Sequence, residues 1–135
     1  MPSMAAVLAF SIRAVVSRGG GPQNAFAAIV FPADRGSATI DVSKYPEVQQ
    51  QDYKLFLAKC STCHTTARAV NASYVLPKEW KSCVARMQKM PGAGINASMA
   101  KRIAAFLSYD SAARKKDLLD KKAPAEKSGA KAAAE

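Results

Sequence analysis

The stretch Cys60-Ser61-Thr62-Cys63-His64 carries the clearest chemical signal in the chain. Two thiols three positions apart can each add across a vinyl group of one haem, and the imidazole that follows can coordinate its iron. A C-x-x-C-H run is therefore typical of a site where haem is attached covalently. The run predicts one haem c, bound through Cys60 and Cys63, with His64 as an iron ligand.

His64 is the only histidine of the 135-residue chain, so this polypeptide offers no second imidazole ligand. The same chain contains five methionines. A methionine thioether opposite a histidine raises the reduction potential of haem iron. We therefore expect the sixth iron ligand to be a methionine.

Two other chemistries use cysteines at this spacing. A thioredoxin-like redox site needs a strand–helix–strand setting, and no such pattern surrounds residue 60. A zinc site would need Cys60, Cys63, His64 and Cys83 to converge, since three cysteines and one histidine form an acceptable tetrahedral set. Adjacent side chains on a helical turn diverge by about 100°, so Cys63 and His64 suit the edge and centre of a haem better than one small ion. Cys83 is then expected to be a buried, unpaired thiol.

Apolar periodicity predicts an all-α fold of about three to four helices. The predicted elements are a first helix over residues 46–62, a loop over 65–76, a second helix from Lys78 to Met90, and a third helix that starts at Asn96 or Ser98. Trp80, on the second helix, is expected to be a packing residue. A core of this size is marginal on its own, and a bound haem would supply a large apolar body for the helices to pack around.

The chain divides into three parts by composition. Residues 41–113 are predicted to form the haem domain, and residues 114–135 a flexible Lys/Ala-rich tail. Residues 111–122 are expected to extend the last helix, and the chain past Ala123, which lacks an apolar period, is expected to be disordered or to act as a tether. Residues 1–40 are an export signal or a retained N-terminal arm. In the export reading, residues 25–31 are a short apolar region and residues 36–38 a small-residue cleavage site.

The formal net charge is +10, from 20 basic and 10 acidic side chains. Half of this excess falls in residues 41–113, where ten basic residues oppose five acidic ones. A positive field of this kind steers a protein toward an acidic partner surface. Nucleic-acid binding is not expected, because no recognised module or basic–aromatic pattern accompanies the charge.

Three segments together resemble class I cytochrome c. The first helix reads Phe56-Leu57-Ala58-Lys59-Cys60, with an aromatic residue four positions before the first haem cysteine, and the last helix contains Ile103-Ala104-Ala105-Phe106-Leu107. The resemblance covers residues 48–110. It implies a small cytochrome c fold around one covalently bound haem, in which the first and last helices cross with Phe56 and Phe106 in contact.

Two methionines are candidates for the sixth ligand. Met90 lies in a Met-Pro-Gly-Ala-Gly-Ile stretch similar to the methionine loop of mitochondrial-type cytochromes. Met87 lies in a Trp80-x3-Val84-x2-Met87 register that resembles a compact bacterial group with a short His-to-Met spacing. Because only 23 residues separate His64 from Met87, and 26 from Met90, the compact type fits better and Met87 is the favoured ligand.

The resemblance implies an electron carrier rather than an enzyme, located in the periplasm or at the outer face of the cytoplasmic membrane of a bacterium. The expected partners are redox proteins with an acidic docking surface. The alternative is a cytochrome subunit of a larger respiratory or photosynthetic membrane complex, docked through the N-terminal arm and the Lys/Ala tail. A haem enzyme or gas sensor with an open iron position is a third reading, disfavoured by the surplus of methionines.

Overall fold

The computed structural model describes residues 31–132, and the described chain is helical without any β-strand. The elements are η1 (Pro32–Asp34), α1 (Glu47–Cys60), α2 (Ala67–Val70), α3 (Pro77–Gln88), α4 (Ala97–Arg114) and α5 (Lys116–Ala132). The all-α prediction is therefore confirmed. The described chain has more helices than the three to four expected, because α2 and α5 were not predicted as separate helices.

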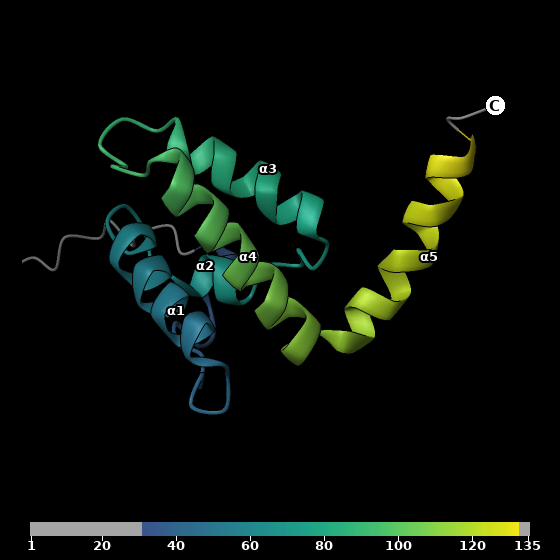
Figure 1. The fold of residues 1–135 in the computed structure, drawn as a ribbon, viewed down its shortest axis with the longest axis horizontal. Helices are drawn as coiled ribbons and strands as arrows, with labels where there is room; N and C mark the ends of the chain where they lie inside the picture. The colour runs from purple at the N-terminus through teal and green to yellow at the C-terminus, as the bar shows by residue number, and fades with distance from the viewer. Residues whose placement is uncertain (1–30, 133–135) are drawn as a thin grey trace, which may run out of the picture.

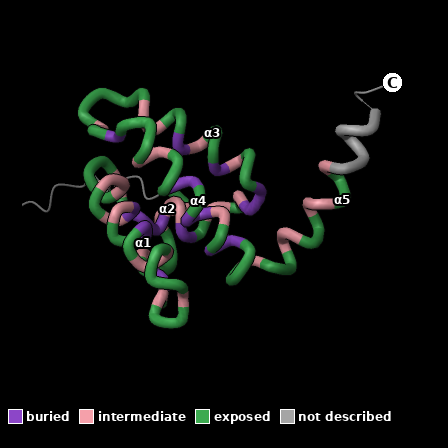
Figure 2. The backbone as a smooth tube through the Cα atoms, in the orientation of Figure 1, coloured by how far each residue is buried: buried purple, intermediate pink, exposed green. Residues whose placement is uncertain are grey.

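The core lies where α4 packs against both α1 and α3 (Figures 1 and 2). Phe56 of α1 and Phe106 of α4 are fully buried, with ring centroids 5.8 Å apart. Tyr53 completes the cluster, with its ring 5.4 Å from that of Phe106. The predicted contact between Phe56 and Phe106 is thus confirmed, and it fixes α1 on α4.

The first helix ends earlier than predicted, at Cys60 instead of residue 62. Two hydroxyl groups close its last turn: Ser61 Oγ donates to the carbonyl of Leu57 at 2.6 Å, and Thr62 Oγ1 donates to that of Lys59 at 3.1 Å. Because serine and threonine compete with the backbone in this way, they favour the end of a helix over its continuation. The cysteine motif therefore begins at the last residue of α1 and continues into a turn.

The second predicted helix is α3, which ends at Gln88 instead of Met90. Its start is stabilised by Glu79, whose Oε2 accepts hydrogen bonds from the backbone N–H of Val75 at 2.8 Å and of Leu76 at 2.9 Å. Met90 lies in the turn that follows, where Gly92 has a φ of 79°, a value that disfavours other residues.

The third predicted helix begins where expected, because Asn96 Oδ1 accepts a hydrogen bond from the N–H of Met99 at 2.8 Å. It continues to Arg114 and is followed at once by α5. Past Ala123, where disorder or a tether was expected, the chain is helical, since α5 runs to Ala132. Alanine and lysine favour a helix even where no apolar residues recur at helical spacing. The lack of that spacing in the tail therefore indicates only that α5 buries no side chain among its described residues.

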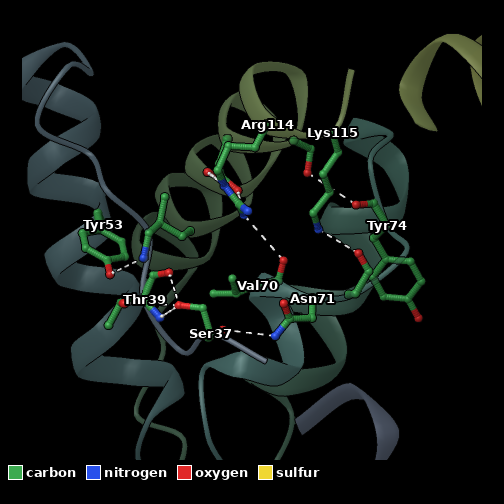
Figure 3. A network of polar contacts seen from close by, with 12 residues as sticks. Ser37, Thr39, Tyr53, Val70, Asn71, Tyr74, Arg114 and Lys115 are labelled. Atoms are coloured by element: carbon green, nitrogen blue, oxygen red, sulfur yellow. Dashed lines mark hydrogen bonds and ion pairs between the residues drawn. The ribbon is translucent and has the colours of Figure 1, made fainter. Parts of the chain in front are cut away.

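The ten described residues before the expected boundary at Asp41 contact α1 and the region of α2. Ile40 is buried and its N–H donates to Tyr53 Oη at 3.0 Å. Thr66 Oγ1 donates to the carbonyl of Ala38 at 2.6 Å, and Asn71 Nδ2 donates to that of Ser37 at 3.1 Å (Figure 3). The suggested cleavage site at residues 36–38 therefore lies in a segment that is hydrogen-bonded to the rest of the fold. Residues 25–30 of the suggested apolar region lie outside the described residues.

The loop predicted over residues 65–76 contains a short helix, α2, whose Ala67 and Val70 are buried. The sequence Ala-Arg-Ala-Val is too short to show a period, which explains why it was missed. After α2 the chain continues without regular structure to the start of α3.

Candidate haem-binding site

A cavity of about 580 Å³ opens between the turn after α1, the segment after α2, and one face of α3, with α4 behind it. Its volume is in the range of cofactor and ligand pockets. All five residues predicted from the sequence line it, namely Cys60, Cys63, His64, Met87 and Met90. The structure therefore brings the cysteine motif and both candidate methionines to one place.

The three cysteines differ in exposure, and all are free thiols. Cys60 is half-buried at the end of α1, where burial, and secondarily the nearby Cys83, raises its pKa to about 11. Cys83 is half-buried on α3 and its pKa is raised by burial, while Cys63 is exposed in the turn. The raised pKa favours the protonated thiol of Cys60 over its thiolate. Formation of a thioether with a haem vinyl group would add the sulfur to one vinyl carbon and the hydrogen to the other.

His64 is oriented by its own backbone neighbour. Its Nδ1 lies 2.9 Å from the carbonyl oxygen of Thr65. Because a carbonyl oxygen only accepts, Nδ1 carries the hydrogen in this contact. Metal-ligating histidines commonly donate one ring N–H to a backbone carbonyl in this way and bind the metal through the other nitrogen.

The two methionines occupy different environments. Met87 is half-buried on α3 and packs against the core. Met90 lies beyond the end of α3 and is 54% exposed. Both touch the cavity, but only Met87 comes from a regular element that fixes the direction of its side chain.

Comparison with family models, curated proteins and solved structures gives no match.

The alternatives at the cysteine motif find no support in the described part of the chain. No group of three or more His, Cys, Asp or Glu side chains there is arranged to hold a metal ion, so Cys60, Cys63, His64 and Cys83 do not form a zinc set. A thioredoxin-like setting is excluded for residues 31–132, because they contain no strand. Within the same residues, none of the helices is both long and apolar enough to cross a membrane.

Trp80 forms the back wall of the cavity and confirms the packing role predicted for it. It is 1% exposed, and Tyr74 meets its ring edge-on at a centroid distance of 5.4 Å. The indole N–H donates to Ser111 Oγ of α4 at 2.9 Å. This bond ties the cavity wall to a part of α4 that the sequence did not connect with the site.

Three basic side chains at the cavity were not predicted as site residues: Lys59, Arg68 and Arg86. Arg68 forms an ion pair with Asp34 at 2.6 Å, which brings the N-terminal segment next to the cavity. Arg86 Nη2 donates to Tyr74 Oη at 3.4 Å. Basic residues are scattered along the whole chain, so no sequence pattern distinguishes these three.

Proposed function

We propose that this chain is a monohaem c-type cytochrome that transfers single electrons. One observation carries the proposal: two thiols, the single histidine of the chain and two thioethers come from two separate segments and line one cavity. When bound, the haem iron supplies a one-electron redox couple, whose potential depends on ligand identity and burial.

Each residue at the cavity would have one role toward the haem. Cys60 and Cys63 hold the macrocycle by two thioether bonds, and His64 Nε2 ligates the iron. Met87 is the sixth ligand, supported by its half-buried place on α3 and by the 54% exposure of Met90. Trp80 excludes water from one side of the site, because it is buried behind the cavity.

The proposed location is the periplasm or the outer face of the cytoplasmic membrane, where the expected partners are redox proteins with an acidic surface. The charge of +10 favours such partners, at rates that fall as salt is added. A second candidate role, as a subunit of a larger membrane complex, is favoured by α5, which projects from the core (Figure 1) and has no buried residue over positions 116–126, where burial is described. Size exclusion of the native protein separates the two, since a free carrier elutes alone.

The proposal is tested by acid–acetone extraction of protein produced together with a c-type haem attachment system. Wild type should keep its haem in the protein pellet, and the double variant Cys60→Ala, Cys63→Ala should release it. Cys83→Ala is the matched control and should retain haem like wild type, because Cys83 lines the same cavity outside the motif. Extraction of all haem from wild type would show that the attachment is not covalent.

A further inference from the structure

The backbone of the segment after α2 is held by side chains from the C-terminal part of the chain (Figure 3). Four carbonyl groups between residues 70 and 74 each accept a hydrogen bond from a residue between 111 and 122. The pairs are Arg114 with Val70 at 3.5 Å, Lys115 with Ala72 at 2.7 Å, Lys122 with Ser73 at 2.8 Å, and Ser111 with Tyr74 at 3.4 Å. The two lysine bonds are the short ones, so they carry most of the interaction.

Three of these four carbonyls belong to residues that line the cavity, and the fourth, that of Val70, lies just before them. Ala72, Ser73 and Tyr74 line the cavity, whereas Lys115 and Lys122 do not. The lysines therefore hold the wall from its outer side. Because the segment has no regular structure of its own, these side chains supply the partners that a helix or sheet would otherwise give its carbonyls.

The Lys122 ammonium also reaches the start of α3. Its Nζ lies 2.8 Å from the carbonyl oxygen of Ser73 and 2.7 Å from Glu79 Oε1. The other carboxylate oxygen of Glu79 accepts from the N–H groups of Val75 and Leu76. One lysine thus links α5, the end of the cavity wall and the first turn of α3.

Lys115 is packed into this arrangement and is not a solvated surface lysine. Its Nζ lies 5.5 Å from the centroid of the Trp80 ring. Burial, and then the nearby Arg114, lowers the pKa of Lys115 to about 8. A neutral amine still donates a hydrogen bond, so the contact with Ala72 does not require the charge.

We propose that Lys115 and Lys122 are positioning residues that hold the cavity wall over residues 70–76 and thereby set how far water reaches the haem. This inference rests on the proposed function for its effect on the haem, but the holding of the wall is independent of it. Burial is one of the terms that set a haem potential, and water stabilises the more highly charged ferric state. A loosened wall should therefore lower the potential.

The test uses Lys115→Met and Lys122→Met, which keep side-chain length and remove the donor. Lys121→Met is the matched control: it removes a lysine at an exposed position of α5, next to Lys122 and six residues after Lys115. Backbone amide exchange should become about tenfold faster at residues 71–76 in each of the two variants, and unchanged in the control and in α1. The reduction potential should fall in both variants by more than in the control.

The readouts distinguish the two proposals. If the purified protein carries no haem, the proposed function fails, yet amide exchange still tests the wall. Unchanged exchange at residues 71–76 would overturn the positioning role. If amide exchange becomes faster in Lys115→Met and Lys122→Met but their reduction potentials equal that of Lys121→Met, the proposed effect of the cavity wall on the haem is overturned.

Discussion

Replacing Met87 by alanine is the sharpest test of the iron ligands. The substitution removes a thioether that is half-buried in the cavity wall and packs against the core. Burial of a whole methionine is worth about 2 to 5 kcal/mol against alanine. For a half-buried side chain the expected loss is about 1 to 2 kcal/mol of unfolding free energy.

The substitution should also change the reduction potential of the iron, because it removes the proposed ligand. Loss of a thioether ligand should lower the reduction potential by something on the order of 100 mV, given how strongly axial ligands set it. The weak far-red absorption band of sulfur-bound ferric iron should vanish, and carbon monoxide should bind the reduced protein.

Two matched variants separate ligation from packing. Met87→Leu conserves volume and should lose the band with little loss of stability. Met90→Ala removes a side chain that is 54% exposed, so the band should remain and the stability should change by less than about 1 kcal/mol. Loss of the band in Met90→Ala, with the band intact in Met87→Ala, would refute the assignment of Met87.

Three further outcomes follow from the described contacts. Ser111→Ala leaves the buried indole N–H of Trp80 without its acceptor, which should cost about 1 to 3 kcal/mol in denaturant unfolding. Phe56→Ala opens a cavity at the fully buried contact between α1 and α4, and should cost about 3 to 5 kcal/mol by the same measurement. Glu79 gives a pH dependence: burial raises its pKa, but Lys122 and the N–H groups at the start of α3 outweigh this and lower it to about 2. Its contribution to stability is therefore complete above the ordinary pKa of 4.5 and lost as pH falls toward 2.

Each of these has a control in the chain. Ser108→Ala removes only a bond within α4, to the carbonyl of Ala104, and should cost less than Ser111→Ala. Phe31→Ala removes an exposed ring and should cost less than Phe56→Ala. In Glu79→Gln the unfolding free energy should depend less on pH between about 4.5 and 2 than in wild type. An unchanged pH dependence would contradict the lowered pKa of Glu79.

The parts of the fold that could be predicted carry local signals. Pro77 and Asn96 mark the starts of α3 and α4, and the apolar spacing places Phe56 on the face of α1 that meets Phe106. Cys60, Cys63 and His64 could be predicted as candidate site residues for the same reason, since the C-x-x-C-H run is contiguous. Each of these signals depends only on residues that are close together in the sequence.

The rest could not be predicted because it depends on contacts between distant residues. Nothing in the sequence near Ile40 indicates that its N–H will meet Tyr53. The lysines that hold the cavity wall bind backbone carbonyls, which are the same for every residue and leave no pattern. A Lys/Ala-rich tail gives the same composition whether it contacts the core or not, so Lys115 and Lys122 were indistinguishable from their neighbours.

The late position of Lys122 has a consequence for the order of events during synthesis. It lies 48 residues after Tyr74 in the chain. At ribosomal rates of about 5 to 20 residues per second, Tyr74 precedes Lys122 by roughly 2 to 10 seconds. During that interval the cavity wall lacks the hydrogen bond from Lys122 to Ser73. The wall can therefore reach its final support only after α1, α3 and α4 have all been synthesised.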